Sequence, residues 1–183
     1  MENNPVKTLA AEHKVIERVE IVVNLLDRLW ETEPVQYKEF ITKLIRFFKD
    51  YSDIYHHQKE ETVLFPELDA HPEFFLHAII HELEAHHEAF RDSVKEIENA
   101  LNQDEFVITH SILKQYINDL LDHIAVENEE LFIMAENMFS VRELENMYFK
   151  FKDIDAELGE DIKTELENIP KEIEHYFALK NEL

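Results

Sequence analysis

The chain has no cysteine, a single glycine and five prolines among 183 residues. Without cysteine it can form no disulfide, thiolate nucleophile, iron–sulfur cluster or zinc–thiolate site. One glycine and few prolines supply little of the turn chemistry that β-hairpins need, whereas Leu, Ile, Glu, Lys and Ala are good helix formers. The sequence therefore predicts an all-α protein, and its length is that of one domain, alone or with an extension.

Positive charge is scarce as well, because 18 Lys and Arg stand against 41 Asp and Glu, for a net charge of -23. An acidic surface of this kind repels phosphate backbones and anionic membrane surfaces. Apolar runs of about 18 residues, the length that spans a membrane, are absent, and the start MENNPVKTLAAEHK has no signal-like apolar segment. We therefore expect neither nucleic acid nor membrane as a partner, and a cytoplasmic location.

Apolar residues recur with a helical period along four long stretches of the chain. Short polar or proline-containing connections separate them, and each stretch is about 40 Å long at 1.5 Å per residue. Such a pattern predicts an antiparallel up-down-up-down four-helix bundle over residues 1–139. The expected helices cover residues 5–30, 34–66, 76–101 and 105–137.

Residues 140–183 form a C-terminal helical extension in this interpretation. Ser140 with Glu143 three positions later is a capping-box pattern, which starts a helix that ends before Gly159. A second helical stretch follows, and Pro170 is expected to interrupt it. The apolar residues of both stretches predict packing on the bundle or on a second subunit, the latter giving a homodimer.

An internal repeat carries the chemistry of the sequence. Residues 56–65 read HHQKEETVLF and residues 123–132 read HIAVENEELF, so both follow the pattern HxxxE[EN]xxLF. The helix before each motif also contains a histidine in a similar context, EHKVI at residues 12–16 and HHEAF at residues 86–90. The repeated unit is therefore a pair of helices.

A His and a Glu four residues apart lie on one helical face, so both can reach the same metal pair. Each half supplies one such pair and one further histidine, and an antiparallel bundle can bring all of them to one depth. Without a partner, so many buried imidazoles and carboxylates would be costly. Mixed nitrogen and oxygen ligation by six side chains suits two iron ions better than a tetrahedral zinc site. The candidate ligands are His13, His56, Glu60, His87, His123 and Glu127.

Neighbouring residues on the second helix offer an alternative. Counted back from the shared Leu-Phe pair, His56 and Glu60 match the second motif, whereas His57 and Glu61 fall one position late. His57 stays a further ligand candidate. Glu61 is expected to accept a hydrogen bond near the site or to face solvent.

On the third helix His87 continues the apolar stripe and is preferred to His86, which a modest helix rotation would turn inward. His81 on the same helix is a further candidate, as a ligand or as an outer partner of one. The remaining histidines lack such a context and are expected at the surface or in loops: His71, His77, His110 and His175.

These motifs, in this order over about residues 8–137, resemble the hemerythrin-like, or HHE cation-binding, family. The resemblance implies a four-helix bundle with a non-haem di-iron centre, whose ions an oxo or hydroxo group can bridge. It carries the ligand role onto the six residues His13, His56, Glu60, His87, His123 and Glu127. Ferritin-like proteins use Glu-x-x-His motifs instead, and the spacing here is His-x-x-x-Glu.

Two departures bear on function. Oxygen-carrying members of the family have a second histidine four residues before the third-helix ligand and an Asp as last carboxylate, whereas this chain has Leu83 and Glu127. The resemblance therefore favours a protein that binds or senses oxygen or nitric oxide, or handles iron under stress, over a plain oxygen carrier. A di-iron oxidase or peroxidase acting on oxygen or peroxide is the alternative. An iron-dependent interaction module, read out by the extension, is the third.

Overall fold

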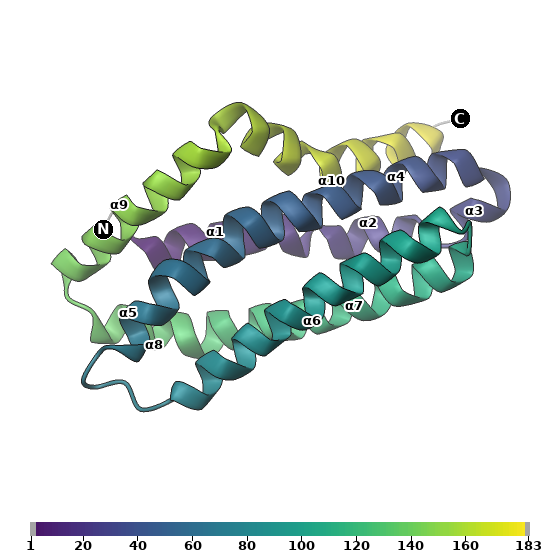
Figure 1. Cartoon of the computed structure of the whole chain (residues 1–183). Helices are drawn as coiled ribbons and strands as arrows, with labels where there is room; N and C mark the ends of the chain where they lie inside the picture. The colour runs from purple at the N-terminus through teal and green to yellow at the C-terminus, as the bar shows by residue number, and fades with distance from the viewer. Residues whose placement is uncertain (1–2, 182–183) are drawn as a thin grey trace.

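The structure, a computed structural model, describes residues 3–181, and these residues form helices joined by short turns without any strand. The all-α prediction is confirmed. Figure 1 shows the helices lying lengthwise beside one another, with the chain reversing direction at each end of the molecule.

Four lengthwise runs precede the C-terminal helices. The first contains α1 (Pro5–Glu17), α2 (Val19–Leu25) and α3 (Leu29–Thr32). The second contains α4 (Pro34–Arg46), the π-helical segments η1 (Phe47–His57) and η2 (Glu60–Leu64), and α5 (Phe65–Asp69). The third is α6 (His77–Asn102), and the fourth contains α7 (Phe106–Val126), the π-helical η3 (Glu127–Leu131) and α8 (Phe132–Met138).

Local chemistry explains where these runs begin and end. Asn4 caps α1 by accepting a hydrogen bond from the Val6 amide at 2.9 Å, and Pro5 stands at the first helical position, where its missing N–H costs nothing. Arg28 and Asp104 adopt left-handed backbone conformations, with φ of 63° and 56°, and both lie in the turns that reverse the chain. The first expected helix, 5–30, is divided into three, with one break at Arg18, whose backbone is right-handed, and a second break that ends at the left-handed Arg28.

Buried apolar side chains form two separate clusters along the bundle. One includes Ile16, Phe48, Phe90 and Leu120, and the other includes Leu9, Leu64, Leu83 and Leu131. Both clusters draw on all four runs. The middle of the bundle, between the two clusters, is therefore the place where polar side chains can be buried at a common depth.

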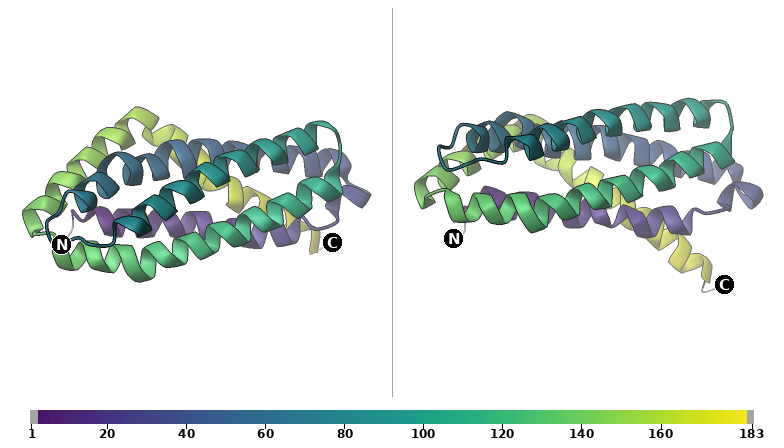
Figure 2. Two further views of the ribbon diagram at one scale, coloured as in Figure 1. Left: turned by 60° about the horizontal axis from the view of Figure 1, so that its bottom comes forward. Right: turned by 90° about the horizontal axis from the view of Figure 1, so that it is seen from below.

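The C-terminal segment consists of α9 (Val141–Leu158) and α10 (Glu160–Asn181). The expected capping box starts α9, with Ser140 and Glu143 bonded to each other, and Gly159 at φ 87° ends it. The α9 helix packs on α1 and η2, and α10 packs on α2, α4 and η1. In the right-hand view of Figure 2, α10 crosses the bundle obliquely.

The helix α10 continues through Pro170, so the expected interruption there is wrong. Leu166, Ile169 and Ile173 on either side of the proline are all buried in one of the apolar clusters. Burial of three such side chains contributes roughly 1.5–3 kcal/mol each, which outweighs the cost of about 3 kcal/mol for a proline inside a helix.

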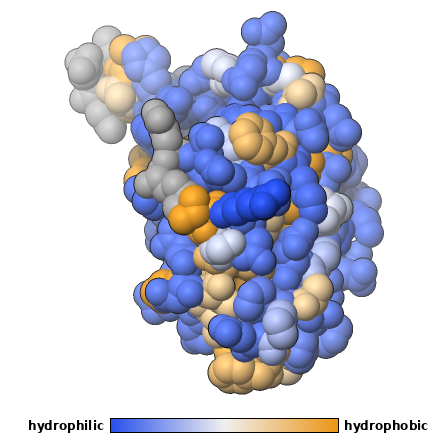
Figure 3. Space-filling model, turned by 90° about the vertical axis from the view of Figure 1, so that its left-hand side faces the viewer, coloured by the Kyte–Doolittle hydropathy of each residue, from blue (hydrophilic) through white to orange (hydrophobic). Residues whose placement is uncertain are grey.

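The surface at one end of the molecule is mainly hydrophilic (Figure 3). Figure 3 shows the end of the molecule at the left of Figure 1, where hydrophilic side chains cover most of the face and hydrophobic ones gather in small groups. Within residues 3–181, no helix combines the length and the apolar character that crossing a membrane requires.

His110 is buried, contrary to the expectation of a surface or loop position. Its Nδ1 lies 3.4 Å from the Tyr37 hydroxyl, and its ring lies 5.0 Å from that of Trp30. Aromatic side chains from the first two runs cover it, which a helical period on α7 alone could not reveal. Burial lowers the pKa of His110 to about 4.

This shift predicts a loss of stability in mild acid. The folded pKa lies below the unfolded value of about 6.5, so the stabilisation is present above pH 6.5 and is lost as the pH falls towards 4. Between pH 7 and pH 5 His110 should account for about 2 kcal/mol of the decrease in unfolding free energy. Urea denaturation of wild type and His110→Gln at both pH values measures it; equal decreases in the two proteins would contradict the prediction.

Candidate metal centre

The helix positions of the candidate ligands coincide with the boundary between the two apolar clusters. His13 lies between Leu9 of one cluster and Ile16 of the other, and His87 lies between Leu83 and Phe90 in the same way. All of the candidate histidines and glutamates from the two motifs are buried. The structure thus brings His13, His56, Glu60, His87, His123 and Glu127 into one buried layer.

Two groups of side chains in this layer have the geometry to hold a metal ion. Site A comprises His13, His56, Glu60 and Glu127, and site B comprises His57, His87, His123 and Glu60. Within each group the potential ligand atoms all lie within 4.8 Å of one another.

Glu60 belongs to both sites and lies between them. Its Oε1 is 3.4 Å from His56 Nε2 in site A, and its Oε2 is 3.6 Å from His87 Nε2 in site B. Glu127 also spans the layer, because its Oε2 lies 3.2 Å from His13 Nε2 and 3.3 Å from His123 Nε2. Two carboxylates placed in this way can each contact two metal ions, one in site A and one in site B.

His57 joins the group together with His56, although the two are adjacent in sequence. Both lie in the π-helical segment η1, and the consecutive residues Tyr55, His56 and His57 are all buried. The i→i+5 bonding of a π-helix widens the turn, so successive side chains point in more similar directions than in an α-helix. The choice between His56 and His57 came from the register of the internal repeat, but in the π-helical segment both imidazoles belong to a candidate metal group.

The His57 ring stacks on that of His87 at 3.8 Å, so it enters site B from the second run. The fifth imidazole of the layer therefore comes from η1, whereas Leu83, four residues before His87 on α6, belongs to an apolar cluster.

Four of the five imidazoles direct Nδ1 at a hydrogen-bonding outer partner, and Nδ1 of the fifth, His57, lies within ion-pair distance of Asp53 without a hydrogen bond. Such a contact sets the tautomer that leaves Nε2 free to bind a metal, and it fixes the orientation of the ring. The contacts from Nδ1 are His13 to Asn128 at 3.0 Å, His56 to Glu12 at 2.9 Å, His57 to Asp53 at 3.4 Å, His87 to Glu61 at 2.8 Å and His123 to His86 at 3.4 Å.

The internal repeat extends to these outer partners. Glu61 and Asn128 both directly follow the motif glutamate, and each holds the histidine of a different run. Glu12 and His86 both directly precede a candidate ligand, and each faces the first histidine of a motif. Sequence reasoning missed Glu12 and Asn128, which these repeated positions would have identified.

The remaining candidates lie further out. His86 is half-buried and faces His123 rather than either site, whereas the His81 side chain is 77% exposed. Arg91 was missed entirely; its guanidinium donates to Asp53 at 2.8 Å and to Glu61 at 2.6 Å, so it holds the partners of two site-B histidines.

The shifted pKa values of the buried glutamates and histidines in this layer favour binding of cations. Burial, together with the neighbouring Glu127, raises the pKa of Glu60 well above its usual value. Burial also opposes ionisation of Glu127, but His123 and His13 beside it outweigh burial and hold its pKa well below the usual value. Burial lowers the pKa of His56 and His57 well below the usual value, so both imidazoles are neutral and can coordinate.

Hydrogen bonding supports the same conclusion. Both carboxylate oxygens of Glu60 and of Glu127, and Nε2 of His13, are buried without a hydrogen-bond partner. Unpartnered buried carboxylates cost several kcal/mol unless a cation or proton neutralises them. The donor set of imidazole nitrogens and carboxylate oxygens therefore fits a pair of transition-metal ions.

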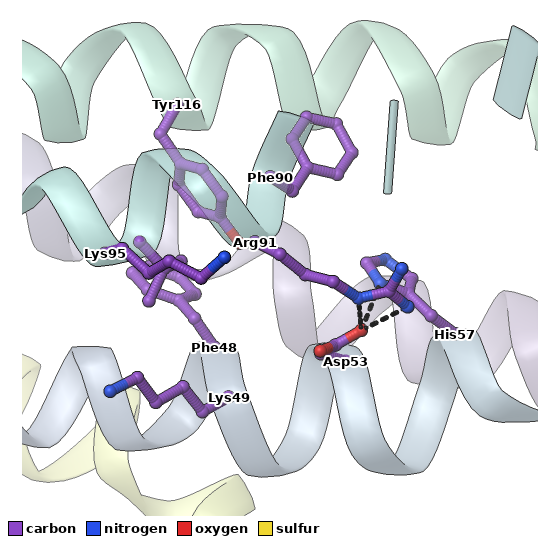
Figure 4. Close-up of a pocket in the computed structure, with 9 residues that line it drawn as sticks. Phe48, Lys49, Asp53, His57, Phe90, Arg91, Lys95 and Tyr116 are labelled. Atoms are coloured by element: carbon purple, nitrogen blue, oxygen red, sulfur yellow. Dashed lines mark hydrogen bonds and ion pairs between the residues drawn. The ribbon is translucent and has the colours of Figure 1, made fainter. Parts of the chain in front are cut away.

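A cavity of about 220 Å³ reaches the layer from one side, between η1, α6 and α7. Figure 4 shows its lining residues, among them the aromatic rings of Phe48, Phe90 and Tyr116, and Arg91 bonded to Asp53 beside His57. This cavity, called the passage below, therefore borders site B at His57, and Phe48, Phe90, Val94 and Tyr116 form its apolar lining.

The unpaired carboxylates predict an unusual pH dependence for the metal-free protein. Because the folded pKa of Glu60 is raised, its contribution to stability is present below the unfolded value and is lost as the pH rises through the folded pKa. Glu60→Gln removes this loss, so its stability relative to wild type should grow between pH 5 and pH 8, by at most about 1.4 kcal/mol per unit. Urea denaturation in the presence of a chelator tests this, and parallel pH curves would refute it.

Comparison with known proteins agrees with the geometry. The family model for the hemerythrin HHE cation binding domain matches residues 4–135 of the chain. Searches of curated proteins and of solved structures found no match. The matched region contains every residue of sites A and B and ends before α9. The chain belongs to the hemerythrin HHE cation-binding family, whose domain it contains over most of its length.

Proposed function

We propose that this protein is a hemerythrin-like antiparallel four-helix bundle that holds two iron ions and binds or senses oxygen or nitric oxide. The observation that carries the proposal is the pair of buried sites that share Glu60. We assign the ligand role to His13, His56, Glu60, His87, His123 and Glu127, together with His57.

Iron fits the donor set better than zinc does. Structural zinc sites take four ligands in a closed tetrahedron, whereas five imidazoles and two carboxylates here surround two adjacent positions. When bound, the two iron ions would supply an open coordination position and reversible redox chemistry. The chain itself orients the imidazoles through their Nδ1 partners and keeps water out with the two apolar clusters.

The passage beside His57 supports a small, weakly polar ligand. Its walls are Phe48, Phe90, Val94 and Tyr116, and the charged side chains Lys49 and Lys95 stand at the surface end. A diatomic gas needs no polar recognition, and apolar walls let it reach site B without drawing water along.

Proton supply favours binding over reduction of oxygen or peroxide. Burial raises the pKa of Asp53, but the neighbouring His57 and the hydrogen-bonded Arg91 outweigh burial and hold the pKa at about 2. His87 and Arg91 similarly lower the pKa of Glu61 against the effect of burial, and burial raises that of Tyr116. At neutral pH the carboxylates of Asp53 and Glu61 are therefore ionised and have no proton to donate, and the Tyr116 hydroxyl holds its proton too tightly to donate it. An oxidase or peroxidase would need a donor at this position.

Metal binding gives the first test. Anaerobically purified protein should contain two iron ions per chain, and its optical spectrum should change on addition of oxygen or nitric oxide. Replacing His56 and His123 by Ala should abolish iron binding, because both sites lose an imidazole. His81→Ala, on an exposed position of α6, is the matched control and should leave two ions bound. Wild type without iron would refute the proposal, and steady turnover of peroxide would favour the enzyme.

The passage gives a second test. Val94→Phe adds bulk to the buried wall of the cavity, and should slow association of nitric oxide by roughly 10-fold while the iron content stays unchanged. Val107→Phe, at a 68% exposed position on α7, is the control. Stopped-flow absorbance measures both rates. An unchanged rate in Val94→Phe would place the ligand route elsewhere.

A further inference from the structure

Lys59 is a buried lysine in the immediate surroundings of the metal centre. It lies between η1 and η2, its side chain is 0% exposed, and its ammonium group lies 3.4 Å from the centre of the Tyr55 ring. A buried ammonium ion is stable only where carboxylates accompany it. Two do so here: Lys59 Nζ donates to Glu12 Oε1 at 2.5 Å and forms an ion pair with Asp155 Oδ1 at 2.8 Å.

Glu12 connects this lysine to site A. One of its oxygens accepts the hydrogen bond from Lys59, and the other accepts from Nδ1–H of His56 at 2.9 Å. This contact turns His56 Nε2 towards Glu60. The position of the Glu12 carboxylate, and with it the His56 ring, therefore depends on where Lys59 is held.

Asp155 belongs to α9, outside the residues that match the family domain. It is buried, and its other oxygen lies 2.7 Å from Lys152 Nζ. Phe151 and Met147, one and two turns earlier on the same face of α9, are buried in an apolar cluster and hold the helix against the bundle. The ion pair between Asp155 and Lys59 is thus a fixed contact of a docked helix.

We propose that α9 contributes to the metal centre: its Asp155 positions the imidazole of His56 through Lys59 and Glu12. The inference rests on the proposed function in one respect, that site A binds a metal ion. It concerns site A alone, because Asp53, Glu61 and Arg91 hold the site-B histidines His57 and His87 independently.

The coupling works in both directions. If the Asp155 contact favours the metal-binding orientation of His56, a metal ion bound at site A favours the Asp155 contact by the same factor. Loss of the ion loosens α9, and the C-terminal segment reports on occupancy of the site. The exposure of α9 to solvent therefore depends on iron, because the contact between Asp155 and Lys59 is stronger when site A is occupied.

The test uses Asp155→Asn in the full chain, with Asp153→Asn as the matched control. Asp153 is an exposed residue of the same helix, so its replacement changes the net charge equally without touching Lys59. Competition with a chromogenic chelator under anaerobic conditions measures Fe²⁺ affinity. We expect Asp155→Asn to bind one of two ions about 10-fold more weakly, and Asp153→Asn to match wild type.

A double-mutant cycle identifies the route of the effect. Glu12→Gln should weaken the same ion by more, up to about 100-fold, because Glu12 contacts His56 directly. In the Glu12→Gln background, Asp155→Asn should then change the affinity little. Additive effects of the two substitutions would overturn the proposed connection through Lys59 and Glu12.

Two further readouts separate positioning from general stability. In the Co²⁺-loaded protein, Asp155→Asn should speed solvent exchange of the His56 Nδ1 proton while the His87 proton, held by Glu61, exchanges as in wild type. Amide hydrogen exchange over residues 147–158 should slow on Fe²⁺ loading in wild type and Asp153→Asn, but not in Asp155→Asn. Far-UV circular dichroism confirms that all variants fold.

The outcomes are distinct. A wild type that binds two ions, with Asp155→Asn behaving as Asp153→Asn in affinity and exchange, overturns the role of α9 and leaves the proposed function standing. A wild type that binds no metal ion overturns both.

Discussion

The central constraint in this molecule is the burial of two glutamates in the middle of an apolar bundle. Glu60 and Glu127 are fully enclosed, and their carboxylate oxygens have no hydrogen-bond partner in the protein. Five imidazoles from four helical runs surround them, and apolar clusters close the bundle on both sides. Such an arrangement is stable only where protons or cations neutralise the carboxylates, and the metal ions of the proposed centre would supply that charge.

The surroundings of this layer organise it further. Four of the five candidate imidazoles have a hydrogen-bonding outer partner at Nδ1, which leaves Nε2 free to bind an ion, and His57 has Asp53 within 3.4 Å of its Nδ1. Two basic residues, Lys59 and Arg91, hold the carboxylates among those partners. Lys59 in turn depends on Asp155, which joins the C-terminal segment to the centre. Lys59 and Arg91, two of the few basic residues of this acidic chain, thus lie around the layer of candidate ligands.

The two halves of the bundle contain the same His-x-x-x-Glu motif, but they differ within it. His56 corresponds to His123 and Glu60 to Glu127, but His57 corresponds to Ile124 and Lys59 to Val126. The first half therefore provides an additional imidazole and a buried ammonium that the second half lacks. These two differences make sites A and B chemically different, and the cavity lined by His57 lies beside site B.

The sequence by itself determined the helical class and the repeated His-x-x-x-Glu motifs, because both rest on local spacing along a helix. The six side chains that the motifs indicate lie together in the structure. Tertiary structure alone decided that η1 turns His56 and His57 inward together, that α10 continues through Pro170, and that α9 brings Asp155 to Lys59. Each depends on packing between segments distant in sequence, which outweighs local preference and leaves no periodic trace.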